Sequence, residues 1–352
     1  MDKQWIAQCR LRNQRINRPG ELTASDVVRR LGAIQAQDYS QALWAVGLRM
    51  QQAHASEVEN AIAEKHIVLT WAMRGTLHLV TAEDVHWMIK LLAPRILSKS
   101  QPRLKQMGLD SKLLSHFEDL IYQALKEKKR MNRAELMALL EDKGFVTKNG
   151  RGYLLLWYLA QIGLICLGPM EGKQQTFVLL EEWLPNRKSY SKEESLKEIA
   201  ERYFTGHGPA TVHDFAWWSG LTVTEARTGI EAAALALHSE KIAGVEYWMG
   251  PDSAKGNESG VFLLPGFDEY LLGYKDRSAV LEKKFAPFIV PGNNGVFKPM
   301  LIVDGQIEGT WSRKIKKDGV DISVSPFSPT TPWSVESLDQ SIQRYRKFVE
   351  AF

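Results

Sequence analysis

The chain has few of the residues on which disulfide-bonded and metal-binding proteins depend. Its 352 residues include two cysteines, Cys9 and Cys166, which cannot build a disulfide framework, and no Cys-x-x-Cys pair is present. His207 and His213 have no carboxylate or cysteine in register beside them, so we expect no metal site. No apolar run approaches the roughly 18–20 residues that a membrane span requires.

Signatures of several common activities are also missing. The chain has no Gly-rich phosphate-binding loop and no Gly-x-Ser-x-Gly nucleophile motif, and no cofactor is expected. Residues Met1–Trp5 show no charged-then-apolar leader, which predicts a cytoplasmic protein. The net charge of +4, from 45 basic and 41 acidic residues, permits a basic surface but does not require one.

The composition is that of an ordinary globular protein. Hydrophobic residues make up 44% of the chain and charged residues 24%, and the length predicts two or more structural units. Eleven tryptophans are many for this length. Most should lie in cores, although aromatic side chains also wedge between nucleic-acid bases or stack on them.

Residues 131–180 give the clearest structural pattern. Asn132 and Glu135 have the spacing of a helix start, a second helix is expected over Tyr153–Ile162, and two strands follow around a turn at Gly168–Lys173. Helix, helix and β-hairpin is the order of a winged helix. The same order recurs over 195–250, with a helix from Thr222 to about Leu237, and less cleanly over 22–80.

The rest of the chain shows other patterns of predicted helices and strands. A long helical stretch is expected over about 82–128, and short strand-like runs separated by turns follow Pro251. Asp304-Gly305 between two of these apolar runs predicts a hairpin. We therefore predict an α+β fold with tandem winged-helix (helix-turn-helix) units and a C-terminal β-rich, barrel-like module. The predicted domains are 1–130, a first winged-helix unit with a helical connector; 131–190 and 191–255, a second and a third winged helix; and 256–352, the β-module with its closing helix.

Two strings in the first unit stand out chemically. Apolar spacing over 27–34 predicts an amphipathic helix that ends at Gln35, in the string Gln35-Ala36-Gln37. Two glutamines around one apolar residue form a neutral pair that can hold a water but cannot take its proton. The second string, 70–80, carries Arg74 and His78, whose side chains suit an anionic backbone. By themselves these residues support only a helical nucleic-acid-binding protein.

Together the two strings resemble the AlkZ/YcaQ-type DNA glycosylases, a winged-helix family whose active site carries a Gln-apolar-Gln or Gln-apolar-Asp motif. The resemblance extends to Leu264–Leu272, Asp276-Arg277 and the block from Phe297 to Trp311, so it covers about residues 22–315. It implies a DNA repair enzyme acting on double-stranded DNA with N7-alkylated, or even crosslinked, bases. Such a protein would be nucleoid-associated when bound to DNA. We expect a monomer.

The resemblance implies that Gln35 and Gln37 are catalytic. A purine alkylated at N7 already carries a positive charge, so positioning a water is most of what hydrolysis still needs. Asp38 is one residue too late to be the carboxylate of the Gln-apolar-Asp members. Lys65, the nearest downstream lysine, belongs to no Schiff-base motif, so a monofunctional glycosylase without a lyase step is expected.

The same resemblance suggests which residues contact DNA. Arg74 and His78 would touch phosphates beside the damaged nucleotide, although a plain turn and a half-buried strand residue explain them equally well. For Trp71 there are two expectations: it packs beneath the site, or it contacts DNA. In the C-terminal module the DNA-binding candidates are Arg277, Arg313 and Lys314; for the last two a solvated strand end is the alternative.

Two other functions fit the pattern of helices. One is a non-catalytic winged-helix regulator, but the candidate recognition helix Tyr153–Ile162 is apolar nearly throughout, which counts against reading base edges. The other is a scaffold that uses its winged helices for protein contacts. Turnover separates the glycosylase from the regulator, and a basic concave surface separates both from the scaffold.

Overall fold

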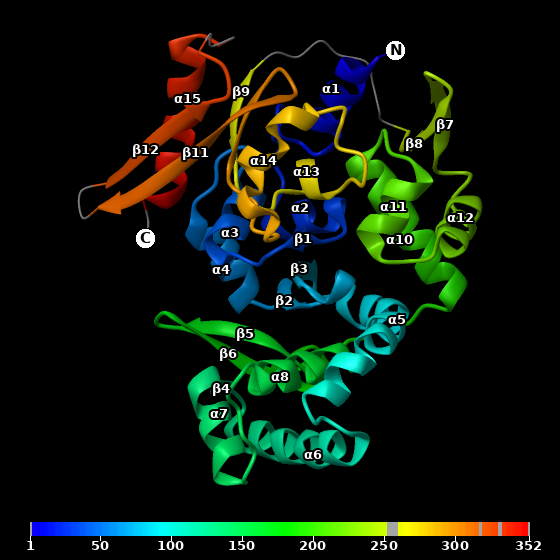
Figure 1. Ribbon diagram of the computed structural model, residues 1–352, viewed down its shortest axis with the longest axis vertical. Coiled ribbons are helices and arrows are strands. Elements are labelled where there is room, and N and C mark those ends of the chain that lie inside the picture. The colour runs from blue at the N-terminus through cyan, green and yellow to red at the C-terminus, as the bar shows by residue number, and fades with distance from the viewer. Residues whose placement is uncertain (1, 252–259, 317–318, 330–332, 351–352) are drawn as a thin grey trace. The chain divides into compact units, whose positions relative to one another are not determined.

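The computed structural model describes residues 2–251, 260–316, 319–329 and 333–350 (Figure 1). The chain forms two compact units. Unit 1 consists of Met1–Glu59 together with Leu196–Phe352, and unit 2 of Asn60–Ser195. No helix of the described ranges is long and apolar enough to cross a membrane.

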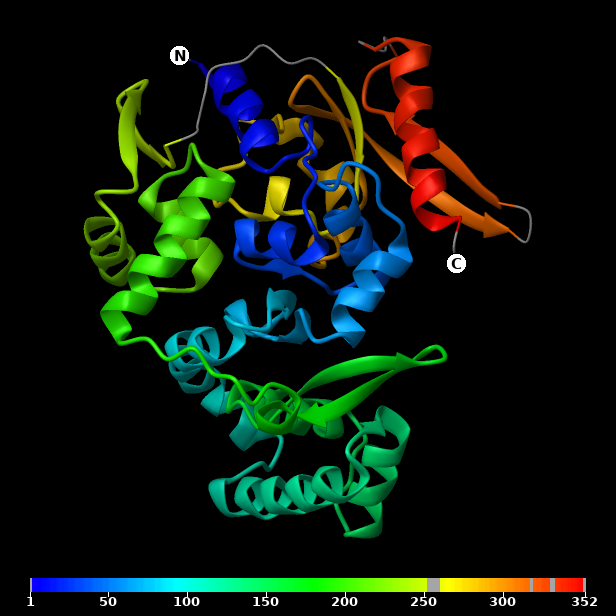
Figure 2. The ribbon, with the colours of Figure 1, turned by 180° about the vertical axis from the view of Figure 1, so that it is seen from behind.

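Unit 2 is built around antiparallel strands in the order β3-β2-β5-β6-β4, with helices α5 to α9 (Figure 2). The strands are β2 (Ile67–Trp71), β3 (Leu77–Thr81), β4 (Met131–Asn132), β5 (Ile165–Glu171) and β6 (Gln174–Leu179). The helices are α5 (Val85–Gln106), α6 (Ser111–Lys128), α7 (Arg133–Asp142), α8 (Arg151–Gln161) and α9 (Leu180–Trp183).

Most of the short-range sequence patterns in unit 2 predict the helices and strands that the structure forms. The Asn132 side chain accepts from the Glu135 N–H, and the Glu135 carboxylate accepts from the Asn132 N–H at 2.7 Å, so a capping box starts α7 as expected. The stretch expected to be helical over about 82–128 consists of the two helices α5 and α6. One expectation was wrong: the turn predicted over Gly168–Lys173 is mostly strand, because an irregular register in β5 lets pairing continue to Glu171.

Unit 1 combines segments from both ends of the chain. Its first part holds α1 (Lys3–Asn13), α2 (Ala24–Leu31), β1 (Ile34–Gln35), α3 (Tyr39–Gly47) and the start of α4 (Ala55–Ala63). Its second part contains most of α10 (Lys192–His207), then α11 (Val212–Ser219), α12 (Val223–Ala232), β7 (His238–Ile242), β8 (Val245–Met249), β9 (Val261–Leu264), α13 (Glu269–Leu272), α14 (Ala286–Ile289), β10 (Met300–Val303), β11 (Gln306–Lys316), β12 (Gly319–Pro326) and α15 (Val335–Val349). Helix α12 ends five residues before the predicted Leu237.

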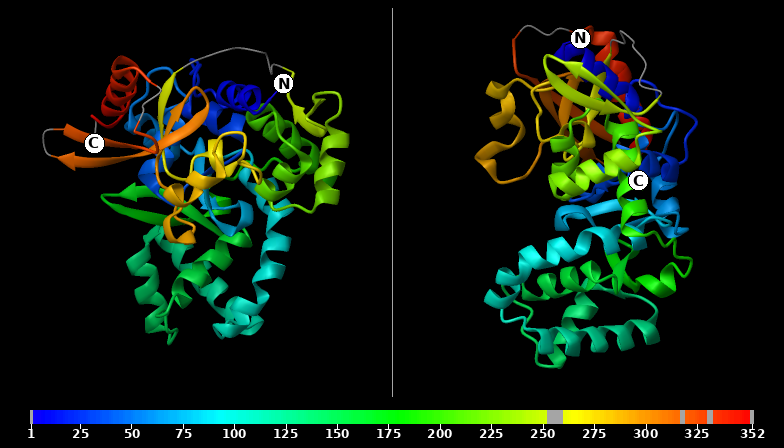
Figure 3. Two further views of the ribbon diagram at one scale, coloured as in Figure 1. Left: turned by 45° about the horizontal axis from the view of Figure 1, so that its top comes forward. Right: turned by 90° about the vertical axis from the view of Figure 1, so that its right-hand side faces the viewer.

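The C-terminal strands form one antiparallel sheet in the order β12-β11-β10-β9, and α15 lies along it (Figure 3). The reversal expected at Asp304-Gly305 joins β10 to β11. Within the described ranges the sheet is open, with β12 and β9 at its edges, so the predicted barrel-like closure is not seen.

The helix predicted to end at Gln35 stops earlier. Helix α2 begins at a capping box between Thr23 and Asp26 and ends at Gly32, whose φ of 75° is the left-handed conformation that glycine tolerates. A Cβ there would also lie 3.2 Å from the Trp218 ring. The chain then becomes extended, and Gln35 lies on strand β1.

The mixed helix and sheet content agrees with the predicted class. Along the chain, α6-β4-α7-α8-β5-β6 and α10-α11-α12-β7-β8 each run from helices into a hairpin, the order expected of winged helices. The assignment of these segments as winged helices, and the four domain boundaries, stay predictions.

Both cysteines should be unreactive while the protein is folded. Burial raises the pKa of the Cys9 thiol to about 12, and it also raises the pKa of the fully buried Cys166 thiol. Because the thiolate is the nucleophile, we expect both thiols to react with an aromatic disulfide reagent at pH 8 at least about a hundredfold more slowly than free cysteine. Both should react fully in denaturant. One thiol reacting at the free rate in native protein would contradict the burial described here.

Candidate active site

The Gln-Ala-Gln motif starts on strand β1 of unit 1 and runs into the bend that precedes α3. Gln35 is 9% exposed, Ala36 is 2% exposed, and Gln37 is exposed. Strand β1 ends at Gln35, and the chain bends at Gln37 and Asp38 before α3 begins. The motif therefore lies on the connection between β1 and α3 and not on a helix.

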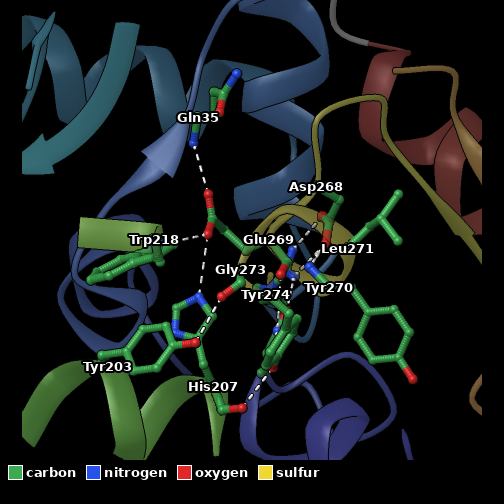
Figure 4. A network of polar contacts seen from close by, with 12 residues as sticks. Gln35, Tyr203, His207, Trp218, Asp268, Glu269, Tyr270, Leu271, Gly273 and Tyr274 are labelled. Atoms are coloured by element: carbon green, nitrogen blue, oxygen red, sulfur yellow. Dashed lines mark hydrogen bonds and ion pairs between the residues drawn. The ribbon is translucent and has the colours of Figure 1, made fainter. Parts of the chain in front are cut away.

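A buried carboxylate holds the backbone of the motif. Oε1 of Glu269 accepts the Gln35 backbone N–H at 3.2 Å, and Oε2 accepts the Trp218 indole N–H at 2.8 Å (Figure 4). Nε2 of His207 lies 3.3 Å from the same Oε2. Glu269 is 1% exposed and His207 is fully buried. These N–H donors offset the loss of water around the carboxylate.

The ring of His207 is itself held in place by its neighbours. It stacks on Tyr203, with ring centroids 4.7 Å apart and planes 14° from parallel. The Tyr203 hydroxyl donates to the Gly273 carbonyl at 2.7 Å. A Cβ on Gly273 would lie 2.5 Å from Cδ2 of His207, so a glycine is required for this close approach (Figure 4).

The residue before Glu269 anchors the other end of the motif segment. Asp268 forms a bidentate ion pair with Arg49, with N–O distances of 2.8 and 2.9 Å, and both side chains are at most 1% exposed. The Arg49 guanidinium also donates to the Ala45 carbonyl at 2.7 Å and to Oε1 of Gln14 at 2.8 Å. The C-terminal end of α3 is thereby fixed to the 267–269 turn.

Asp38, which follows the motif, has a structural role. Its Oδ1 accepts the Gln41 backbone N–H at 3.1 Å and the Ser40 hydroxyl at 2.7 Å, so Asp38 is the N-cap of α3. This use of the carboxylate agrees with the expectation that Asp38 does not replace the Asp of the Gln-apolar-Asp pattern. The described residues contain no group of three or more His, Cys, Asp and Glu side chains placed to hold a metal ion.

Two of the three candidate DNA-binding residues of unit 1 are fixed by protein contacts. The Arg313 guanidinium donates to Oγ of Ser40 at 2.5 Å and bonds the Tyr345 hydroxyl, which links β11 to the helix that follows the motif. The Arg277 guanidinium lies 5.4 Å from the Trp217 ring centroid, and its Nε donates to the Leu271 carbonyl at 3.2 Å. Lys314 is exposed. Their contact with DNA stays a prediction.

The candidates in unit 2 lie on β2, β3 and the turn between them. Trp71 is 3% exposed and its indole N–H donates to the Tyr153 hydroxyl at 3.0 Å, so core packing is the role that the structure displays. His78 is fully buried, with Nδ1 2.8 Å from the Thr76 carbonyl oxygen. Arg74 is partly exposed and has a φ of 53°. Of these three, Arg74 is the one that is not buried.

The sequence prediction named the motif but missed the residues that hold it. Glu269 and Asp268 belong to the block 264–272 that carries part of the resemblance, but nothing in that block predicts that their side chains are buried. His207 and Trp218 lie in α10 and α11, far from the motif in sequence. Only the fold brings these side chains to β1.

The family model "DNA glycosylase AlkZ-like" matches residues 28–348, so the chain belongs to the AlkZ-like DNA glycosylase family. This membership supports a DNA-binding repair glycosylase and does not favour the non-catalytic regulator.

One relative is similar along nearly its whole length. The chain is 27% identical to the interstrand DNA cross-link repair glycosylase of Streptomyces sahachiroi, over 94% of this chain and 92% of that protein. The solved structure of the Streptomyces sahachiroi DNA glycosylase AlkZ superposes with a TM-score of 0.83 at 25% identity, covering 99% of this chain and 96% of that one.

Breaking the buried ion pair should destabilise unit 1 strongly. Asp268→Ala leaves the Arg49 guanidinium buried without its counter-charge, which typically costs about 3–5 kcal/mol of unfolding free energy. Glu282→Ala removes one partner of an exposed pair with Lys284 and should cost under about 1 kcal/mol. Urea unfolding of both variants measures the difference. Equal stability of the two would show that Arg49 finds other compensation.

Proposed function

We propose that this protein is a monofunctional DNA glycosylase that hydrolyses the N-glycosidic bond of N7-alkylated purines in duplex DNA, with Gln35 and Gln37 orienting the attacking water. The observation that carries the proposal is the motif's geometry: Gln35 lies on a strand and Gln37 is exposed beside it. Both side chains are neutral, and a glutamine amide offers a donor and an acceptor to one water.

The chemistry needs little more than this positioning. An N7-alkylated purine carries a positive charge, so its bond to C1′ breaks readily through an oxocarbenium-like state. The water oxygen bonds to C1′, the C1′–N9 pair of electrons moves into the purine, and the water's proton passes to solvent. The base leaves neutral. Holding the water near C1′ contributes through proximity, which can lower such barriers by several kcal/mol.

Neighbouring carboxylates have other roles in the fold. Asp38 caps α3 and Glu269 accepts N–H groups beneath β1. Asp38 also accepts the Ser40 hydroxyl, and Glu269 also accepts the Trp218 indole N–H. This arrangement supports a mechanism that relies on the charge of the lesion rather than on acid or base groups of the protein.

We further propose that Arg74, Arg277, Arg313 and Lys314 contact phosphates, that the target includes crosslinked purines, and that the enzyme acts as a monomer. The relative from Streptomyces sahachiroi, whose name specifies interstrand cross-link repair, supports the crosslink as a substrate. Phosphate contacts would make binding fall with salt and depend little on sequence. Trp71 and His78 are buried within unit 2, so we propose that they pack in its core rather than touch DNA.

Gln37→Ala should separate catalysis from binding. We expect excision of N7-methylguanine from duplex DNA to fall at least tenfold, about 1.4 kcal/mol of barrier, because the amide acts mainly in the transition state. Folding and DNA affinity should stay nearly unchanged. Gln343→Ala, at an exposed position of α15, is the matched control. Full activity of folded Gln37→Ala protein would remove Gln37 from the mechanism.

The range of lesions tests the mechanism itself. Duplexes carrying N7-methylguanine, N3-methyladenine, hypoxanthine, 8-oxoguanine or uracil are incubated with enzyme, and abasic sites are cleaved with alkali. We expect release of the two cationic bases and little or none of the neutral ones, since general-acid help is worth about 10²–10⁴-fold. Rapid release of hypoxanthine would show that the site contains an acid. A regulator would release none of these bases.

A further inference from the structure

Glu269 is a buried carboxylate that bonds the backbone of the motif. Its Oε1 lies 3.2 Å from the Gln35 amide nitrogen, and its Oε2 is bonded by the Trp218 indole at 2.8 Å. Figure 4 shows the Gln35 side chain pointing away from Glu269, so the carboxylate contacts the backbone of the strand and not the Gln35 side chain.

The surroundings of Glu269 are rigid. Nε2 of His207 lies 3.3 Å from Oε2, and the His207 ring is stacked on Tyr203 and pressed against Gly273. An ionised carboxylate accepts only, and its hydrogen bonds are stronger than those of a neutral acceptor. Glu269 is therefore a fixed acceptor that can determine where β1 lies.

We infer that Glu269 is a positioning residue for excision, which sets the backbone of Gln35 and through it the water-binding geometry of Gln35 and Gln37. This inference rests on the proposed function. A displacement of about 1 Å in a reacting group costs up to about 10²-fold in rate. A lost Gln35–Glu269 bond should therefore lower the rate of the chemical step without weakening DNA binding.

Glu269→Gln tests the inference, with Glu231→Gln at an exposed position of α12 as the matched control. The amide keeps the shape of the carboxylate but loses its charge, and it presents an N–H group where Trp218 and His207 also donate. We expect the single-turnover excision rate for N7-methylguanine to fall at least tenfold, with the Kd for the same duplex changed less than twofold. Glu231→Gln should match the wild type in both.

A second variant guards against misfolding. Glu269→Asp keeps the charge but shortens the side chain by one methylene, which withdraws the acceptor from the Gln35 amide. It should also lower the excision rate while DNA affinity is retained. In a Gln37→Ala background, Glu269→Gln should add less than a twofold loss, because both changes remove the same geometry. A full tenfold loss in that background would overturn the positioning role.

Amide hydrogen exchange gives a readout that does not depend on activity. The Gln35 amide should be protected in the wild type and exchange at least tenfold faster in Glu269→Gln, but not in Glu231→Gln. If the wild type excises no base, the proposed function fails while exchange still tests the bond. An unprotected Gln35 amide in the wild type, or a folded Glu269 variant with fast exchange and full excision, would overturn the inference.

Discussion

Two adjacent buried carboxylates fix the position of the motif segment. Asp268 pairs with Arg49 at the C-terminal end of α3, and Glu269 accepts the backbone N–H of Gln35 on β1. The segment from 35 to 49 is thereby held at both ends by one turn of the chain. Buried charges are tolerated only when they are paired and hydrogen-bonded, so the turn and the segment specify each other's positions.

The same constraint explains why unit 1 is built from distant parts of the sequence. The Trp44 indole donates to the Leu263 carbonyl at 2.7 Å, and Oε1 of Gln41 accepts from the Gly266 N–H at 2.9 Å. Each bond joins α3 to the loop and strand before the 267–269 turn, across more than two hundred residues of sequence. The helix that follows the motif therefore depends on the C-terminal part of the chain for its position.

The charged groups beside the motif have structural roles, whereas the side chains proposed to orient the water are neutral. Asp38 caps α3 and Glu269 accepts buried N–H groups, while Gln37 presents a neutral amide at an exposed position. A site of this kind suits a leaving group that brings its own positive charge. Membership of the AlkZ-like DNA glycosylase family is consistent with that division, since such enzymes act on damaged DNA bases.

The sequence by itself determined the features that depend on near neighbours. The capping boxes at Asn132 and Thr222 and the reversal at Asp304-Gly305 involve groups within a few residues of each other, so their spacing reveals them. The Gln-Ala-Gln string is also local, but only its resemblance to a known family makes it a catalytic candidate. The tertiary structure decided that Gln35 lies on a strand, that Trp71 and His78 are buried, and that Glu269 lies beneath the motif. Those facts depend on which distant segments pack together, and no local pattern encodes the pairing of side chains more than two hundred residues apart.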